Sequence, residues 1–281
     1  RTTTIRTTGF AILRVGEKKT ILPQDKDHLE ITPEGRVLEH GESDTLYLND
    51  GEARFSAVPW TRGRFLDSDG KPLLRAPYDW GLAAMFRDID QDGDPDLYVC
   101  NDFHSEDQIW INSGEGIFQQ MSDYSLRHTS TFSMAVDFAD VDRDGWDDFF
   151  VADMLSRRHE RRMMQLAAMD PYLSEVGVFS DRPQFDRNTL QLNRGDGTYA
   201  EIADYIGLRE SEWTWSASFL DVDLDGYEDL LCCTGHMFDT QDMDAERRIR
   251  EKGPWPRHLI PSKLLMFPRM KQPKLAFRNG G

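Results

Sequence analysis

One acidic pattern, Asp-x-Asp-x-Asp-Gly-x-x-Asp, occurs three times in this chain of 281 residues. The copies span residues 88–96, 140–148 and 221–229, and each lies between two apolar segments. Each copy places five acidic side chains within nine residues, so their mutual repulsion makes the loop costly to fold unless it binds a cation. Hard oxygen ligands around a tight glycine turn suit Ca²⁺, which takes about six to eight oxygens.

The EF-hand loop shares the first half of this pattern and is the main alternative. An EF-hand needs a bidentate Glu at loop position 12 and a helix on each side. Position 12 is Val99, Val151 and Cys232 in the three copies, so that ligand is missing. The last Asp of each copy leads directly into a short apolar run with branched and aromatic residues, which is typical of a buried strand. We therefore expect each loop to join two strands.

The pattern predicts three Ca²⁺ sites that stabilise the protein. Side-chain oxygens at loop positions 1, 3, 5 and 9 are the expected ligands, with the backbone carbonyl of position 7 and water completing each shell. The residues at these positions are Asp88, Asp90, Asp92, Asp94 and Asp96; Asp140, Asp142, Asp144, Trp146 and Asp148; and Asp221, Asp223, Asp225, Tyr227 and Asp229.

A second signature, Asn-x-Gly-x-Gly-x-aromatic, recurs with the acidic loops, and Ala53 replaces the second glycine in the first copy. It begins at Asn49, Asn112 and Asn193, and Asn and Gly at these positions are typical of a β-hairpin turn. An aromatic residue also lies eight positions before the first Asp of each loop, as Trp80, Phe132 and Trp213. The spacing from hairpin to next loop is 28 residues in two repeats. Units of four strands that recur in this way predict the blades of a β-propeller.

In these loops and turns the chain resembles the FG-GAP/VCBS-type calcium-binding β-propellers, such as the head of integrin α-chains. It most closely resembles bacterial secreted proteins related to cartilage acidic protein. The resemblance covers roughly residues 43–281. It implies an all-β fold, namely an arc of four-stranded blades with helical insertions, truncated at both ends because relatives of this type close with about seven blades.

The repeats divide this single propeller domain into four parts. Residues 1–60 are expected to form a degenerate or partial blade, with outer strands near 45–59 and residues 1–43 as candidates for decayed inner strands. Residues 61–123 hold the first loop, and residues 124–204 hold the second loop and an insertion at 154–187. Residues 205–281 form an incomplete blade with the third loop and an insertion at 236–272. Helices are expected at 155–169 and 239–252.

Composition limits the partners and the compartment. The formal net charge of −17 argues against nucleic acid and against anionic membrane surfaces as partners. The apolar runs are too short to cross a bilayer, so we expect no membrane insertion. Weak calcium loops suit compartments with near-millimolar Ca²⁺, which favours an extracellular or periplasmic protein. The three cysteines, Cys100, Cys232 and Cys233, are expected to be buried small residues without a disulfide.

The leading functional hypothesis is a non-enzymatic, calcium-stabilised scaffold that binds a protein or a glycan. In a blade, the acidic loops and the insertions leave from opposite faces, so the face with the insertions is the expected binding face. Exposed aromatics for a glycan would be Phe103, Tyr172 and Trp255. The insertion at 154–187 could instead be a cap that packs over the blades with its arginines in solvent.

Two alternatives remain open. One is a polysaccharide-active enzyme, a lyase or a glycoside hydrolase, on a calcium-binding propeller; the other is a purely structural segment of a large exported protein. Asp102, Asp153 and His236 lie near the ends of equivalent strands, and His104 and His159 lie close to them in sequence. Such a cluster could form an acid/base site or a second metal site. No nucleophile elbow, zinc motif, P-loop or dinucleotide fingerprint appears in the sequence, which makes a non-enzymatic role the favoured one.

Overall fold

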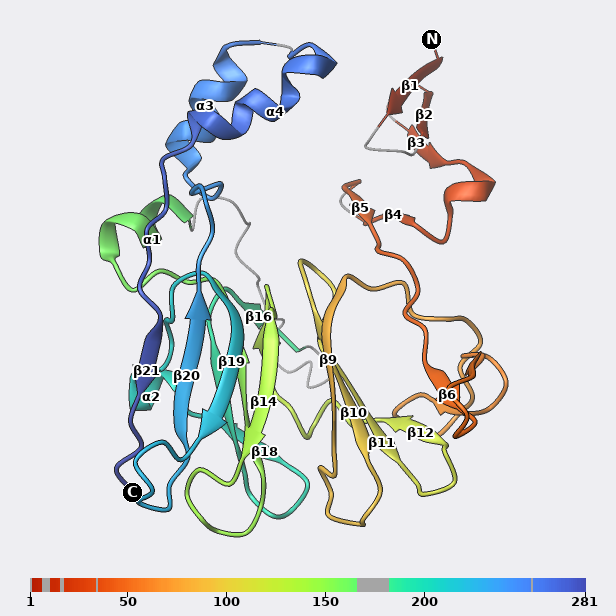
Figure 1. Cartoon of the computed structure of the whole chain (residues 1–281). Coiled ribbons are helices and arrows are strands. Elements are labelled where there is room, and N and C mark those ends of the chain that lie inside the picture. The colour runs from red at the N-terminus through yellow and green to blue at the C-terminus, as the bar shows by residue number, and fades with distance from the viewer. Residues whose placement is uncertain (1, 7–10, 16–17, 34, 166–181, 254) are drawn as a thin grey trace.

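The structure is a computed structural model that describes residues 2–6, 11–15, 18–33, 35–165, 182–253 and 255–281. The described residues are mostly β-strands, with a few short helices (Figure 1). The expected all-β class is therefore confirmed at this level. The described sheets do not close into a ring, and none of the described helices is long and apolar enough to cross a membrane.

The first large sheet holds five strands in the order β8-β12-β11-β10-β9. Its strands are β8 (Phe65–Leu66), β9 (Gly81–Arg87), β10 (Asp96–Asn101), β11 (Gln108–Asn112) and β12 (Phe118–Gln120). Neighbours from β9 to β12 are antiparallel, and β8 runs parallel to β12.

The second large sheet is a four-stranded antiparallel meander, and the third has three strands. The second sheet contains β14 (Ala135–Ala139), β15 (Asp148–Ala152), β17 (Thr189–Asn193) and β18 (Tyr199–Glu201). The third contains β19 (Thr214–Leu220), β20 (Asp229–Thr234) and β21 (Leu275–Phe277). A short parallel pair, β13 (Thr129–Ser130) with β16 (Gln184–Phe185), lies in the connections.

The core lies between these sheets. Strands β10 and β15 are buried along their whole length, which explains their continuous apolar runs. The Tyr98 ring of β10 lies 5.2 Å from the Phe149 ring of β15 and 6.1 Å from the Phe138 ring of β14. These aromatic contacts join the first sheet to the second. A second cluster around Phe150 and Leu230 joins the second sheet to the third.

The N-terminal part forms three separate small sheets in place of the expected blade. They are β1 (Thr2–Arg6), β2 (Ala11–Val15) and β3 (Lys18–Ile21); β4 (Leu29–Ile31) with β5 (Val37–Glu39); and β6 (Tyr47–Asn49) with β7 (Phe55–Ala57). A 3-10 turn, η1 (Pro23–Asp25), precedes β4. Among the described residues, no strand of residues 1–43 pairs with β6 or β7. The described strands of residues 1–43 thus pair with one another and not with the hairpin at 47–57.

The helices of the two insertions begin later than expected. Helix α1 is His159–Gln165, and the buried residues Met154 to Ser156 lie outside any helix before it; residues 166–169 lie outside the described residues. Helix α3 is Met243–Glu251 and begins after Asp242, whose side chain accepts from the Ala245 N–H at 2.8 Å. The remaining short helices are α2 (Ala203–Ile206), η2 (Arg257–Leu259), α4 (Ile260–Lys263) and η3 (Leu264–Met266).

The two ends of the sheets carry different segments. The acidic loops and the hairpin turns lie at the lower end in Figure 1, while α1, α3, α4 and β1–β5 lie at the upper end. We call these the loop end and the insertion end. All three cysteines are free; Cys100 and Cys232 are buried and Cys233 is half-buried, in agreement with the prediction.

Candidate metal centre

Each acidic loop joins two antiparallel strands in the same register. The residue before the first Asp pairs with the last Asp in every copy: Arg87 with Asp96, Ala139 with Asp148, and Leu220 with Asp229. Strands flank all three loops, whereas an EF-hand requires helices on both sides. The expectation of strand-to-strand loops is therefore confirmed.

The three loops share one backbone conformation. The glycine at position 6 has φ of 98°, 95° and 93° in Gly93, Gly145 and Gly226, which a side chain rarely permits. The residue at position 4 also has a positive φ, 62° in Gln91, 63° in Arg143 and 59° in Leu224. Non-glycine residues adopt this region only at a free-energy cost of about 1 kcal/mol or more. Three copies with the same costly geometry indicate a common requirement.

Hydrogen bonds inside each loop fix one oxygen of the first Asp. In the first loop Asp88 Oδ2 accepts from the Gly93 N–H at 3.1 Å, and the same contact measures 3.0 Å from Gly145 to Asp140 and 2.9 Å from Gly226 to Asp221. The second oxygen of Asp88, Oδ1, is buried and has no hydrogen-bond partner among the described residues. An orphaned carboxylate oxygen of this kind fits a bound cation.

The Asp at position 9 connects each loop to its hairpin turn. Asp96 and Asp148 are fully buried, and their Oδ1 atoms accept from the backbone N–H of Asn112 at 2.7 Å and Asn193 at 2.8 Å. Asp229 makes the same contact with Asn279 at 2.9 Å. Burial raises the pKa of Asp96 to about 6 and that of Asp148 to about 7.

Carboxylate oxygens converge in all three loops. Ligand atoms of positions 1, 3 and 9 lie within 4.8 Å of one another in the first two loops, and those of positions 1, 3 and 5 do so in the third. Such a donor set, hard and anionic, fits Ca²⁺ better than a soft metal ion. The backbone carbonyls of position 7 remain predicted ligands.

The third loop differs because a cationic side chain lies beside its carboxylates. Arg278 Nε is 2.7 Å from Asp223 Oδ2, and its Nη2 is 3.0 Å from Asp225 Oδ2. By repeat spacing Arg278 corresponds to Ile111 and Leu192, which are apolar. The guanidinium would have to give up these contacts, or share them, when a cation binds.

Neighbouring loops also contact one another through position 4. The Gln91 side-chain amide donates to the Gly145 carbonyl oxygen at 2.5 Å, and the Arg143 guanidinium lies 5.1 Å from the Tyr227 ring centroid. Arg87, which directly precedes the first loop, forms an ion pair with Asp147 of the second loop. Position 4 is Gln91, Arg143 and Leu224 in the three loops, so no shared residue type signals this role, and only the relative placement of the sheets reveals it.

The five acid/base candidates have separate environments. Asp153 is buried and accepts from the Ser130 hydroxyl and the Phe132 N–H; His104 lies 3.3 Å from His40; and His236 stacks on Trp213 at 4.5 Å. The Asp102 carboxylate accepts from the N–H of its neighbour Phe103, and His159 begins α1. No hydrogen bond or ion pair joins any two of these five candidates in the described part of the chain.

The expected glycan-binding aromatics differ in their exposure. Phe103 is exposed, whereas Trp255 is half-buried and donates its indole N–H to the Ile249 carbonyl oxygen at 3.0 Å. Tyr172 lies outside the described residues.

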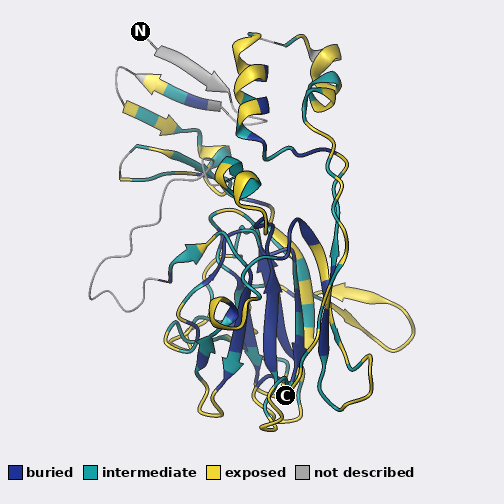
Figure 2. Ribbon diagram, turned by 90° about the vertical axis from the view of Figure 1, so that its left-hand side faces the viewer, coloured by how far each residue is buried: buried dark blue, intermediate teal, exposed yellow. Residues whose placement is uncertain are grey.

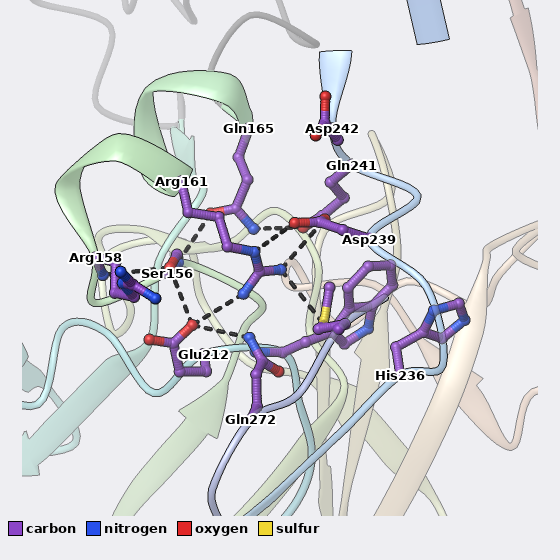
Figure 3. Close-up of polar contacts among 12 residues, drawn as sticks. Ser156, Arg158, Arg161, Gln165, Glu212, His236, Asp239, Gln241, Asp242 and Gln272 are labelled. Atoms are coloured by element: carbon purple, nitrogen blue, oxygen red, sulfur yellow. Dashed lines mark hydrogen bonds and ion pairs between the residues drawn. The ribbon is translucent and has the colours of Figure 1, made fainter. Parts of the chain in front are cut away.

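The two insertions are held together by a polar network at the insertion end (Figure 3). Arg161 of α1 contacts Glu212 Oε2 at 3.0 Å and Asp239 Oδ2 at 2.6 Å, and all three side chains are at most 14% exposed. Glu212 also accepts from the Ser156 hydroxyl at 2.9 Å and from the Gln272 amide at 2.8 Å. Arg161 thus joins α1, the strand connection before β19 and the segment before α3, which favours the cap interpretation of the first insertion.

The Arg161 contacts predict a large, specific loss of stability. Arg161→Ala leaves two mostly buried carboxylates without their cation, so we expect urea denaturation to show a loss of about 3 kcal/mol. Arg158→Ala removes a nearby exposed arginine that forms no ion pair with described residues, and should change stability by less than about 0.5 kcal/mol. Equal losses of stability in the two variants would contradict the stabilising role of the Arg161 ion pairs.

Asp153 predicts a pH dependence of stability. Burial raises its folded-state pKa to about 7, so the carboxyl binds its proton more tightly in the folded protein than in the unfolded chain. Its stabilising contribution is therefore present below about pH 4 and is lost as the pH rises through about 7. In chelator, the free energy of unfolding of Asp153→Asn should fall less than that of the native protein between about pH 5 and pH 8.

A matched control is Asp196→Asn, because the Asp196 carboxyl is exposed and its pKa is lowered by the Thr198 hydroxyl and N–H. It titrates below this pH window and should leave the slope unchanged. If Asp153→Asn and the native protein gave parallel curves, the raised pKa of Asp153 would be wrong.

Comparison with known proteins places the repeats in a family. No curated protein matches the chain. The family model described as FG-GAP-like repeat matches residues 88–151 and 175–232. All three acidic loops, at 88–96, 140–148 and 221–229, lie inside the matched residues. These two segments of the chain are therefore FG-GAP-like repeats.

Proposed function

We propose that this protein is a calcium-stabilised β-propeller-type scaffold that presents the insertion end for binding a protein or a glycan. The observation that carries the proposal is the threefold repetition of one loop geometry. In every copy the same turn aims acidic oxygens at one point, and in the first copy a buried oxygen of Asp88 lacks a partner. FG-GAP-like repeats support the propeller-type arrangement, with the three large sheets as its blades.

The role proposed for the metal is structural. A bound Ca²⁺ would offset the repulsion among five acidic side chains and would stabilise the charged form of the buried position-9 Asp. The protein oxygens would surround the ion within a short turn, which leaves little room for a substrate. The residues that hold it are those at positions 1, 3, 5 and 9, with the carbonyl of position 7.

Binding at the insertion end follows from how the chain varies. The loop end has three turns of one length, whereas both insertions and the small N-terminal sheets gather at the opposite end (Figure 1). Segments that vary on a constant scaffold are where binding residues usually lie. Export to a calcium-rich compartment is part of the proposal, because loops of this type bind Ca²⁺ weakly. An enzymatic role is not favoured, because Asp153 serves its own buried hydrogen bonds and the other candidates do not converge.

Calcium uptake is the direct test of the proposed sites. Calorimetry on folded, chelator-stripped protein should detect three Ca²⁺ equivalents, the third of them weaker because of Arg278. Asp90→Ala should remove one equivalent. Asp94→Ala makes the same charge change in the same loop but removes no predicted side-chain ligand, so it should keep all three. Absence of uptake, or equal loss in both variants, would overturn the proposal.

Thermal stability tests the structural role separately. Binding that favours the folded state adds roughly 2.7 kcal/mol at a hundredfold excess of ion over the dissociation constant. The melting temperature should therefore rise with Ca²⁺. Asp142→Ala should weaken that rise by about a third if the sites contribute equally. A melting curve that is the same with Ca²⁺ and with chelator would show that the ion is not structural.

A further inference from the structure

The charge of the chain is unevenly distributed. Residues 243–274, which we call the helical tip, contain nine Lys and Arg residues against three Asp and Glu residues, an excess of six positive charges in a chain of net charge −17. The tip comprises α3, η2, α4, η3 and the chain that returns to β21, with residue 254 outside the described residues. The rest of the protein is therefore even more acidic than its net charge indicates.

Apolar side chains at the tip are exposed to solvent. Four of them lie within the helical turns 257–266, and their exposed fractions are 41% in Leu259, 48% in Ile260, 40% in Leu264 and 70% in Leu265. Figure 2 shows these helices largely exposed and standing away from the buried strands. Ile260 and Leu264 are spaced by four residues and so share one side of the helical turns.

Cations lie beside this apolar group. Lys252 Nζ is 3.9 Å from the Met266 sulfur of η3, and Lys263 Nζ lies 5.8 Å from the centroid of the Trp255 ring. Within the described part of the chain, neither lysine has a carboxylate in ion-pair range. The basic residues Arg247 and Arg250, by contrast, pair with Asp244 and Glu246 of their own helix. Lys252 and Lys263, which have no ion-pair partner among the described residues, thus lie within or beside the helical turns that carry the exposed apolar side chains.

We infer that the helical tip docks on the surface of a bilayer that contains anionic lipid. Leu and Ile with a Trp, flanked by Lys, are the residue types with which interfacial helices enter the boundary between headgroups and acyl chains. Lys252 and Lys263 would contact lipid phosphates, and Leu264 and Leu265 would enter the acyl boundary. The acidic body would be repelled by the same surface, so the protein would approach with the tip first.

An acidic protein partner has weaker support from the same observations. A protein would have to supply a groove complementary to a convex, protruding tip, whereas a bilayer surface needs no preformed shape. Two cavities, of about 320 and 580 Å³, are lined by residues outside the tip. The overall charge of −17 remains a correct argument against contact through the body.

Cosedimentation of the whole protein with vesicles tests the inference. We expect binding to phosphatidylcholine vesicles that contain phosphatidylglycerol, little binding to phosphatidylcholine alone, and weakening with salt. Lys252→Gln with Lys263→Gln should lower the partition coefficient by roughly thirtyfold, at about fivefold per lysine. Leu264→Ser with Leu265→Ser should lower it by about tenfold without a change of charge.

Matched controls lie away from the tip. Lys71→Gln with Arg194→Gln makes the same charge change on exposed residues, and Leu74→Ser alters a leucine that is 95% exposed. Both controls should bind as the native protein does. Circular dichroism of each variant shows whether the fold is intact.

Calcium must be controlled, because the ion can bridge the acidic loops to anionic lipid. Binding is therefore measured with Ca²⁺ and with chelator, and the tip variants should lose it in both conditions. Binding that needs Ca²⁺ and ignores the tip variants would overturn the inference, as would equal binding to neutral vesicles or equal losses in the controls. Polyglutamate that binds the tip while vesicles do not would assign it to an acidic polypeptide. These outcomes do not depend on the calcium stoichiometry, so the two proposals fail separately.

Discussion

Each repeat depends on the hydrogen bonds that the Asp carboxylate at position 9 accepts from the loop and from the hairpin turn. In Asp96, one carboxylate oxygen accepts from the Ile89 N–H of its own loop at 2.7 Å and the other from the Asn112 N–H of the hairpin turn at 2.7 Å. One side chain thus connects the inner strand pair to the outer one. Burial raises its pKa, so the price of this connection is a carboxylate that is poorly solvated in its charged form. A cation in the loop would relieve that cost, which links the proposed metal site to the packing of the sheets.

This connection also explains why the acidic loop and the Asn-x-Gly turn occur together in each repeat. The Asn-x-Gly turn brings a backbone N–H to the Asp, and the Asn side chain then caps the turn: Asn112 Oδ1 accepts from the Gly114 N–H at 3.2 Å, and Asn193 Oδ1 from Gly195 at 3.0 Å. The residue at position 7 lies against the same glycine, as Trp146 does against Gly195, where a Cβ would be 2.8 Å from its Nε1. Loop and turn are therefore one unit, even though 45 residues separate Asp148 from Asn193.

Much of this unit could be predicted from the sequence, because its determinants are local. Glycine at position 6, alternating aspartates and the apolar runs after position 9 specify turn and strands without reference to the rest of the chain. The N-terminal sheets could not be predicted in the same way, because residues 1–43 carry no repeat and their pairing depends on neighbours. The predicted start of helix α1 was too early for a similar reason: Leu155 has a helical pattern with later residues, but it is buried and lies outside the helix, which begins at His159. Contacts between loops, such as Gln91 with Gly145, depend on how sheets stack and have no sequence signal.

The carboxylates at the two ends of the sheets are neutralised in different ways. At the loop end, acidic groups are crowded by identical turns, and the available relief is a cation from solution or, in the third loop, Arg278. At the insertion end, carboxylates are relieved from within the chain, because Arg161 lies between Glu212 and Asp239. Lys and Arg outnumber Asp and Glu in the helical tip, which also has exposed leucines. A single net charge hides this division, since −17 is the sum of a strongly acidic body and a basic tip. The charge of each end of the scaffold, and not the net charge of the chain, therefore determines which partners it can bind.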